Sequence, residues 1–301
     1  MPRARRQHEN DGRQREKNAQ QTVLWQPGRR WRNGRSGSRS SPPQTWCSRQ
    51  TKTWTQAGTG ASHIKSYIKV LKEYTFEAKL GEHAPNNNIL HEPKGVCALI
   101  TPWNWPMNQT CLKVIPAIAA GCTMVLKPSE IAPLSSMILA EMIDEIKLPK
   151  GVFNLVNGDG AVTGNALTSH PDVNMISFTG STRAGALISE NAAKDFKRVS
   201  LELGGKGANI IFKDADAEAV ERGALRCFRN TGQSCNAPTR MLVEKSMYNE
   251  AVERVKKFAN SMKVDVASKE GDHIGPVVSK TQFDKIQSLI QVGIDEGAKL
   301  V

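Results

Sequence analysis

The first regular pattern of hydrophobic and polar residues in the chain begins at residue 61. From there to residue 78, apolar side chains recur at the spacing of one helical face, and mainly lysine and glutamate lie off that face. The apolar positions are Ile64, Tyr67, Ile68, Leu71, Tyr74 and Ala78. This spacing predicts an amphipathic helix.

Short apolar runs then alternate with helical stretches. The runs are GVCALIT before Pro102, then residues 123–128, 152–156, 174–180 and 198–203, with stretches such as LSSMILAEMIDEI and RAGALISENAAKDF between them. This alternation predicts βαβ crossovers, so the fold class is α/β with a mainly parallel sheet. Ligands bind at the carboxyl ends of the strands in such sheets, so the residues directly after each run are the candidates for a functional site.

A second α/β unit begins near residue 209. The strand-like NIIFKDAD precedes a helix over residues 216–232, and TRMLVEK precedes helices over residues 248–262 and 280–297. Gly297 is predicted to cap the last helix, and residues 298–301 are predicted to begin a further strand. We therefore expect this unit to be cut short.

Residues 1–57 show neither a helical nor a strand period. They hold four of the six tryptophans, and the first 60 residues carry 13 of the 41 Lys and Arg but 3 of the 29 Asp and Glu. The rest of the chain is thus nearly neutral, so the net charge of +12 does not by itself indicate nucleic-acid binding. Three interpretations of the segment stay open: a disordered basic arm that contacts phosphates, an organellar transit peptide, or non-native sequence from a shifted reading frame.

The cysteines and the hydropathy exclude further classes of protein. None of the six cysteines forms a CxxC motif or a Cys/His cluster with zinc spacing, so neither a disulfide framework nor a metal site is predicted. Free thiols indicate a reducing compartment, and we expect a cytoplasmic protein. No apolar run is long enough to span a bilayer, so we expect no membrane association, and no signal sequence is recognisable.

Polar residues follow the first two strands. In TPWNWP, two prolines and two tryptophans surround Asn104, which can direct an amide at a ligand; the alternative is an asparagine that bonds its own turn. In LKPSE, Lys127 and Glu130 can hold the ribose hydroxyls of a nucleotide as donor and bidentate acceptor. The alternative there is a solvated turn in which Ser129 and Glu130 serve as ordinary helix caps.

Glycines follow the next two strands. In NGDGAVTG, Gly158, Gly160 and Gly164 approximate a dinucleotide fingerprint with one spacing different, and a tight strand-to-helix turn explains them as well. In FTGSTRAG, Gly180 and Ser181 open a helix whose exposed amides can cradle a pyrophosphate.

Glu202 and Cys235 are the candidates for covalent chemistry. Glu202 ends an apolar run before two glycines, where it can act as a general base; an ion-paired strand-end carboxylate is the alternative. Cys235 lies in NTGQSCNAP among small polar residues that leave a thiol accessible and provide backbone amides. Such a thiol can attack a carbonyl, the amides of Cys235 and Asn104 can hold the oxyanion, and a nearby nicotinamide can take up hydride.

These motifs resemble those of the NAD(P)-dependent aldehyde dehydrogenase superfamily over about residues 57–301. PWNWP, KPSE, SFTGSTRAG, LELGGK and NTGQSCNAPTR occur in the order of the family. The resemblance implies a Rossmann-like NAD(P)-binding domain over residues 58–208 and part of a catalytic domain over residues 209–301. Two features depart from the family: GGKGANI lacks the commoner Ser-Pro or Asn-Pro after the lysine, and family members are longer, with more of the catalytic domain and an oligomerisation strand.

The resemblance also implies roles for single residues. Cys235 would be the nucleophile, Glu202 the base that activates the deacylating water, and Asn104 the amide that holds the oxyanion. The residues implied to line the cofactor site are Ile100, Thr101, Pro102, Trp103, Lys127, Pro128, Ser129, Glu130, Gly160, Gly164, Phe178, Thr179, Gly180, Ser181, Leu203 and Gly204.

The implied function is oxidation of a small-molecule aldehyde to a carboxylic acid with NAD, or alternatively NADP. Glu130 favours NAD, because a carboxylate on the ribose hydroxyls repels a 2′-phosphate. Three alternatives stay open: a truncated fragment that at most binds nucleotide, acyl transfer to coenzyme A, against which Glu202 argues, and a nucleic-acid tether formed by the basic segment. Family members form homo-oligomers, and the motifs do not identify the aldehyde.

Overall fold

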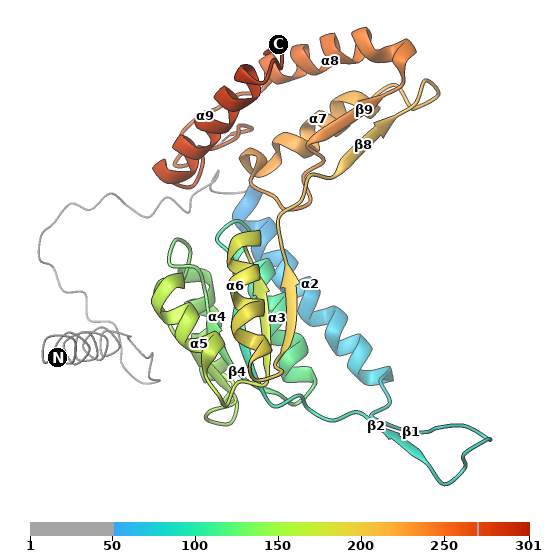
Figure 1. Cartoon of the computed structure of the whole chain (residues 1–301), viewed down its shortest axis with the longest axis vertical. Coiled ribbons are helices and arrows are strands. Elements are labelled where there is room, and N and C mark those ends of the chain that lie inside the picture. The colour runs from blue at the N-terminus through green and yellow to red at the C-terminus, as the bar shows by residue number, and fades with distance from the viewer. Residues whose placement is uncertain (1–50, 270) are drawn as a thin grey trace, which may run out of the picture. The chain divides into compact units, whose positions relative to one another are not determined.

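The computed structural model describes residues 51–269 and 271–301 (Figure 1). The described chain forms two compact units, one containing residues 56–203 and the other residues 204–301. The interpretations of the basic segment concern mainly residues 1–50, which lie outside the described residues.

The predicted amphipathic helix begins and ends earlier than its pattern suggested. α2 spans Thr51–Glu73, so the segment expected to be irregular up to residue 57 ends within a helix. Tyr74 follows α2, and Ala78 lies in β1 (Glu77–Lys79), which pairs antiparallel with β2 (Asn88–Leu90). The pattern misplaced this boundary because a three-residue strand has too few positions to show its own period.

A five-stranded parallel sheet forms the centre of the first unit, as predicted. The strands are β3 (Val96–Ile100), β4 (Thr123–Lys127), β5 (Phe153–Leu155), β6 (Met175–Thr179) and β7 (Arg198–Glu202). Their order is β5-β4-β3-β6-β7, and all neighbours are parallel. The strand order therefore reverses between β3 and β6, which makes the carboxyl ends of these strands a topological switch point where ligands bind.

Helices connect the strands and bury both faces of the sheet. They are α3 (Pro106–Ala119), α4 (Leu134–Glu145), a short π-helical turn η1 (Gly160–Gly164) continued by α5 (Asn165–Ser169), and α6 (Thr182–Ala193). Alternate residues of β3 enter two different clusters: Cys97 and Leu99 pack with α3 and α4, whereas Ala98 and Ile100 pack with α6. Sequence analysis did not identify α3, which Pro106 opens at a position where proline suits a first helical turn.

The second unit has a smaller sheet. β8 (Ala208–Ile211) and β9 (Arg240–Val243) are parallel, with α7 (Ala219–Phe228) and the turn η2 (Arg229–Gly232) between them. The turn η3 (Lys245–Met247), α8 (Tyr248–Ser261) and α9 (Lys280–Asp295) follow. Its buried apolar cluster in the described chain comprises Ile211, Ala219, Val220 and Ala251.

The carboxyl end of α9 confirms one prediction and contradicts another. Gly297 has a φ of 91°, and the amide of Ala298 donates to the carbonyl of Gly293 at 2.9 Å, so the predicted glycine cap is present. Residues 298–301, predicted to begin a strand, form none, because no described strand pairs with them.

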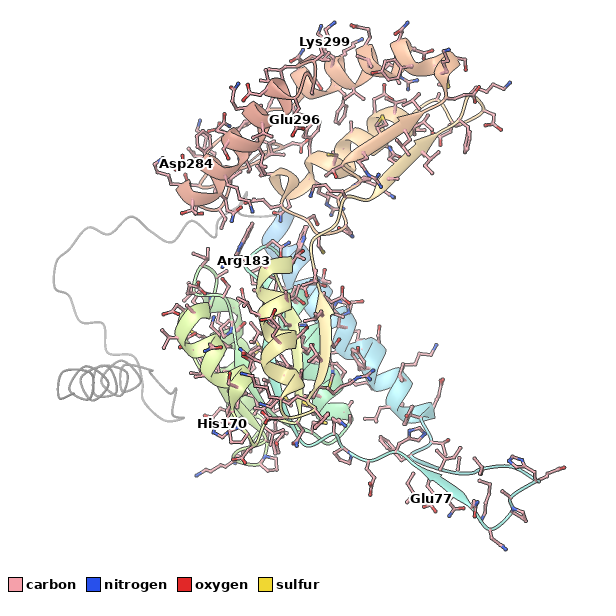
Figure 2. All side chains as sticks on the ribbon, viewed as in Figure 1. Glu77, His170, Arg183, Asp284, Glu296 and Lys299 are labelled. Carbon is pink, nitrogen blue, oxygen red and sulfur yellow. The ribbon has the colours of Figure 1, made fainter. Side chains whose placement is uncertain are left out.

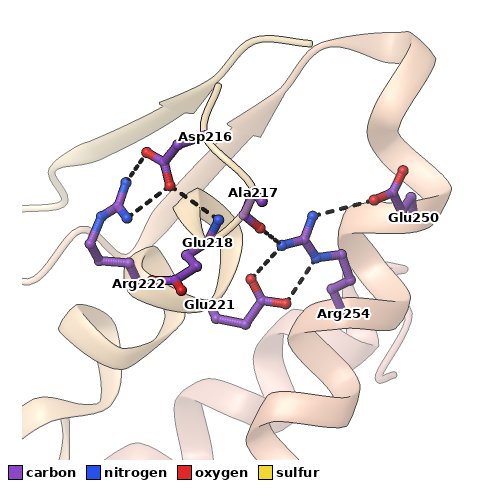
Figure 3. A network of polar contacts seen from close by, with 7 residues as sticks. All are labelled: Asp216, Ala217, Glu218, Glu221, Arg222, Glu250 and Arg254. Atoms are coloured by element: carbon purple, nitrogen blue, oxygen red, sulfur yellow. Dashed lines mark hydrogen bonds and ion pairs between the residues drawn. The ribbon is translucent and has the colours of Figure 1, made fainter. Parts of the chain in front are cut away.

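An arginine network joins α7 to α8 (Figure 3). Arg254 donates from Nε to Glu221 Oε1 at 2.8 Å and from Nη2 to Oε2 at 2.6 Å, and it also contacts Glu250 and the carbonyl of Ala217. The hydrogen bond from Arg254 lowers the pKa of Glu221. These contacts supplement the small apolar cluster between the two helices.

Among the described residues, no helix has both the length and the apolar composition needed to cross a membrane.

Candidate active site

Most residues implied to bind a cofactor lie at the carboxyl edge of the parallel sheet. Ile100 ends β3 and leads into Thr101, whose amide donates to the carbonyl of Lys127 at the end of β4 at 3.2 Å. Thr101 and Lys127 are 3% and 2% exposed, so this part of the edge is packed. Pro102 and Trp103, which follow, are half-buried.

Lys127 and Glu130 form an ion pair after β4. Lys127 Nζ lies 3.4 Å from Glu130 Oε2 and donates to the carbonyl of Pro128 at 3.0 Å. The side chains are 3% and 50% exposed, so the ammonium is buried and the carboxylate reaches solvent. Ser129 Oγ accepts the amide of Ile131 at 3.3 Å and stabilises this turn, whereas α4 begins only at Leu134. The helix-cap interpretation of LKPSE is therefore wrong, because neither Ser129 nor Glu130 caps α4. The role of Lys127 and Glu130 in holding a ribose stays a prediction.

The glycines of NGDGAVTG form a tight turn against Lys127. Asp159 Oδ1 accepts the amide of Val162 at 2.7 Å, and Gly160 and Gly164 bound the turn η1. A Cβ at Gly164 would lie 3.8 Å from Lys127 Cδ. Of the two interpretations, the strand-to-helix turn accounts for this geometry.

The amino end of α6 has the features of an anion site. Ser181 Oγ accepts the amide of Ala184 at 3.2 Å and caps the helix. A Cβ at Gly180 would clash with the ring of Phe178, so a larger residue there would have to displace that ring, and Gly180 itself is half-buried. Arg183, in the first turn of α6, is exposed (Figure 2). The helix dipole and this guanidinium both favour an anion at this end.

Two buried polar atoms at the same edge have no hydrogen-bond partner within the described part of the chain. They are Thr179 Oγ1, at the end of β6, and Asn157 Oδ1, just after β5. Leaving such an atom unsatisfied costs about 1–3 kcal/mol. A ligand with several hydroxyl and amide groups would supply the missing partners.

Glu202 and Asn104 also lie at this edge. Glu202 ends β7 with its side chain exposed, and its carbonyl accepts the amide of Gly180 at 3.0 Å. Asn104 is half-buried between β3 and α3. Leu203 packs against α6, because a Cβ at Gly185 would lie 2.8 Å from its Cδ2, and the exposed Gly204 begins the second unit.

Lys113 is a residue that the sequence analysis missed. It lies on α3, is 7% exposed, and donates from Nζ to Ser177 Oγ on β6 at 2.9 Å. Burial lowers the pKa of Lys113 to about 8, and the charge of Glu202 opposes this shift. A buried ammonium therefore interacts electrostatically with the candidate base. In the sequence, Lys113 is marked only as a single lysine among the apolar residues of α3.

Cys235 lies in the second unit, in the loop between η2 and β9. Among the cysteines in the described residues it is the exposed one, whereas burial raises the pKa of Cys111 and Cys227 and raises that of Cys97 to about 12. Cys235 is therefore the described thiol that a substrate can reach most readily.

The residues just before Cys235 have an unusual backbone. Asn230, Thr231 and Gly232 have φ values of 55°, 59° and 71°, three consecutive left-handed residues. This conformation is rare for a β-branched residue such as Thr231 and costs about 1–3 kcal/mol. Backbone strain of this kind concentrates at functional sites.

Polar side chains hold this loop in place. Thr231 Oγ1 donates to the carbonyl of Gly275 at 2.9 Å, and Gln233 Oε1 accepts the amide of Val278 at 2.8 Å. Asn230 Nδ2 and Gln233 Nε2 each donate to the carbonyl of the other residue at 3.1 Å. The polar neighbours of the cysteine thus serve mainly to fix its backbone, which extends the sequence-based explanation that they leave the thiol accessible.

Comparison with known proteins identifies the family. The model of the aldehyde dehydrogenase family matches residues 44–301, so the chain belongs to this family. A 3-succinoylsemialdehyde-pyridine dehydrogenase of Pseudomonas sp is 52% identical over 247 residues, which cover 82% of this chain and 51% of that protein. The chain spans about half the length of the curated relatives that it matches.

Solved structures agree with this assignment. An aldehyde dehydrogenase from Bartonella henselae has a TM-score of 0.80 at 62% identity, over 81% of this chain and 52% of that one. A variant of aldehyde dehydrogenase C from Pseudomonas syringae, in complex with NAD+ and octanal, has a TM-score of 0.78 at 48% identity, over 81% and 50%. A betaine aldehyde dehydrogenase from Staphylococcus aureus with NAD+ has a TM-score of 0.79 at 34% identity, over 82% and 50%.

Proposed function

We propose that this chain supplies the cofactor-binding residues and the nucleophile for NAD-dependent oxidation of an aldehyde to a carboxylic acid, with NADP as the alternative cofactor. The observation that carries the proposal is the exposed Cys235, which follows a braced and strained loop. Family membership and the parallel sheet with its switch point support it. In domain terms, residues 58–208 form the cofactor domain and residues 209–301 part of the catalytic domain.

The residues at the sheet edge fit a dinucleotide. Lys127 and Glu130 would hold the adenosine ribose, because the pair offers a donor and an accessible carboxylate side by side. Gly180 and Ser181 would receive the pyrophosphate at the amino end of α6. The unsatisfied Thr179 Oγ1 would gain a polar partner. A 2′-phosphate would meet the carboxylate of Glu130, which favours NAD over NADP.

The protein side chains divide the chemistry into two steps. Cys235, as thiolate, attacks the aldehyde carbon, and Asn104 with the Cys235 amide stabilises the oxyanion of the thiohemiacetal. A nicotinamide held at the sheet edge would supply the hydride acceptor for oxidation of this adduct to a thioester. Glu202 then takes a proton from water, which attacks the thioester and releases the carboxylate and the Cys235 thiolate.

Lys113 supports Glu202 in this scheme as a positioning residue. Its ammonium and the Glu202 carboxylate attract one another, as the opposing effect of Glu202 on the lowered pKa of Lys113 indicates. Since the pKa of Lys113 is about 8, its own charge changes near physiological pH. We expect deacylation to depend on the charge of Lys113.

The aldehyde stays undefined beyond its class. The relatives' names specify a pyridine semialdehyde and betaine aldehyde, and one structure contains octanal. We therefore propose a small-molecule aldehyde as substrate, without nucleic acid as a partner. The free cysteines in the described residues support a cytoplasmic location.

Turnover by the purified full chain tests the proposal. NADH formation with NAD+ and a panel of aliphatic and aromatic aldehydes should be detectable and should be abolished by Cys235→Ala. Cys227→Ala, which removes a half-buried thiol of α7, is the matched control and should retain activity. Activity that survives Cys235→Ala would refute the assigned nucleophile.

A second candidate function is nucleotide binding without turnover. It is favoured by the small two-stranded sheet that supports Cys235 in the described chain, in contrast to the five-stranded sheet at the cofactor edge. NAD+ binding without aldehyde-dependent NADH formation would favour this candidate, and robust turnover would exclude it.

A further inference from the structure

The loop that carries Cys235 contacts a second backbone segment of the same unit, residues 205–207, which precede β8. A Cβ at Gly205 would lie 3.3 Å from the carbonyl oxygen of Cys235, and one at Gly207 would lie 3.7 Å from that of Ala237. The first distance is shorter than an ordinary van der Waals contact, so the close approach of the two backbones depends on a glycine at position 205. The segment therefore limits the movement of the peptide group that follows Cys235.

Arg240 holds this segment from the start of β9. Its backbone amide donates to the carbonyl of Gly207 at 3.2 Å, and its side-chain Nε donates to the carbonyl of Lys206 at 2.8 Å. The first bond extends the parallel ladder of β8 and β9, in which Ala208 and Arg240 are register partners. The second is a charge-assisted bond of the side chain, so a substitution can remove it and leave the ladder intact.

The sequence of the segment does little to fix its own backbone. Gly205 and Gly207 flank Lys206, and glycines leave a backbone free to adopt many conformations. No proline follows Lys206 in GGKGANI, so no ring restricts the φ angles there. The side chain of Arg240 therefore supplies a restriction that the segment itself lacks.

We propose that Arg240 is a positioning residue for Cys235. Through the carbonyl of Lys206 it fixes the segment 205–207, and this segment holds the backbone of Cys235 where its amide can stabilise an oxyanion. Hydrogen bonds from the residues before Cys235 fix the loop on its other side. The proposal rests on the proposed role of Cys235 as nucleophile. Displacements of about 1 Å in such an arrangement are enough to slow a reaction strongly.

Two reactions of Cys235 in the purified full chain separate positioning from accessibility. In acylation by 4-nitrophenyl acetate, the thiolate adds to the ester carbonyl, an oxyanion forms, and 4-nitrophenolate leaves to give a thioester. In alkylation by iodoacetamide, the thiolate displaces iodide and no oxyanion forms. Neither reaction needs a cofactor, so peptide mass spectrometry can follow both independently of aldehyde oxidation.

Arg240→Met should slow the acylation of Cys235 about five-fold or more and change its alkylation less than about two-fold, because only acylation uses the oxyanion donor. Gly205→Ala should act in the same way, since the new methyl group displaces the Cys235 carbonyl. Arg240→Lys should retain about half of the wild-type acylation rate or more, because its ammonium can donate to the same carbonyl. The controls are Arg226→Met, at an exposed position of α7, and Gly293→Ala, where a Cβ meets no atom within 4 Å; both rates should stay unchanged.

Two outcomes would overturn the proposal. One is unchanged acylation in Arg240→Met, and the other is equal slowing of both reactions in Arg240→Met and Gly205→Ala, which indicates a general loss of structure. The result is separate from that for the proposed oxidation. The expected pattern without aldehyde-dependent NADH formation would refute the oxidation alone, whereas NADH formation with unchanged acylation in the variants would refute the role of Arg240 alone.

Discussion

Leucine side chains differ in exposure between the strands of the two units. In β4 of the first unit, Leu126 is 0% exposed, whereas Leu242 in β9 of the second unit is 50% exposed. Ile210, the register partner of Leu242, is 58% exposed. The first sheet is buried on both faces, while the second is covered on one face within the described chain. The cofactor edge thus rests on a well-packed framework, and the candidate nucleophile on a lightly packed one.

Cofactor binding and the reaction of the nucleophile are therefore assigned to different units. Residues proposed to bind the cofactor belong almost entirely to the first unit, and the thiol proposed to react belongs to the second. Binding and turnover should therefore respond to different substitutions.

The largest contrast is expected in thiol reactivity. Cys235 is exposed, whereas Cys97 and Cys111 are buried and burial raises their pKa. Alkylation with iodoacetamide at neutral pH, read by peptide mass spectrometry, should modify Cys235 at least about 100-fold faster than either, because thiolate fraction and access both limit the reaction. Comparable labelling of Cys97 in the folded protein would contradict the packing of the first unit.

Matched leucine substitutions test the packing directly. Leu126→Ala should lower the free energy of unfolding of the first unit by about 3 kcal/mol, because it leaves a cavity. Leu242→Ala should change that of the second unit by less than about 0.5 kcal/mol, since half of the side chain is exposed. Hydrogen exchange, which reports each unit separately, gives both values. Equal costs would remove the distinction between the units.

The buried Lys113 should give the first unit a characteristic pH dependence. Its pKa falls from 10.5 to about 8 on folding, so between these values the unfolded chain binds more protons than the folded chain. Stability should therefore rise with pH through this interval. Urea unfolding at several pH values should show this slope in the wild type and a reduced slope in Lys113→Met. An unchanged slope in the variant would assign the dependence to other groups.

The smallest expected effects come from two serine caps, one in each unit. Ser181 caps α6 and Ser279 caps α9 through the same type of hydrogen bond. Each alanine substitution should cost about 1 kcal/mol of local stability. Ser181→Ala should also weaken NAD+ binding, because it disturbs the proposed pyrophosphate site, whereas Ser279→Ala should not. A similar loss of NAD+ affinity in both variants would argue against that site.

The sequence predicted features that depend on period or on local motifs. The five parallel strands and the cap at Gly297 follow from such signals. The β1–β2 hairpin was missed because its strands have three residues each, and Lys113 because one lysine in an apolar run does not reveal its burial or its neighbours.

The loop before Cys235 shows a second limit of sequence reasoning. NTGQSCNAP indicated an accessible thiol, but consecutive left-handed residues at Asn230 and Thr231 have no clear sequence signal, because threonine disfavours that conformation. The hydrogen bonds to Gly275 and Val278 that hold the loop join residues 44 and 45 positions apart, so no local motif indicates them.

Calorimetric titration of NAD+ into the full chain tests the central claim most directly, namely that the cofactor site belongs to the first unit and the nucleophile to the second. The wild type and Cys235→Ala should bind NAD+ with the same affinity, and Lys127→Met should bind it at least about ten-fold more weakly, because it removes the buried donor of the ribose site. Loss of binding in Cys235→Ala, or unchanged binding in Lys127→Met, would contradict this account.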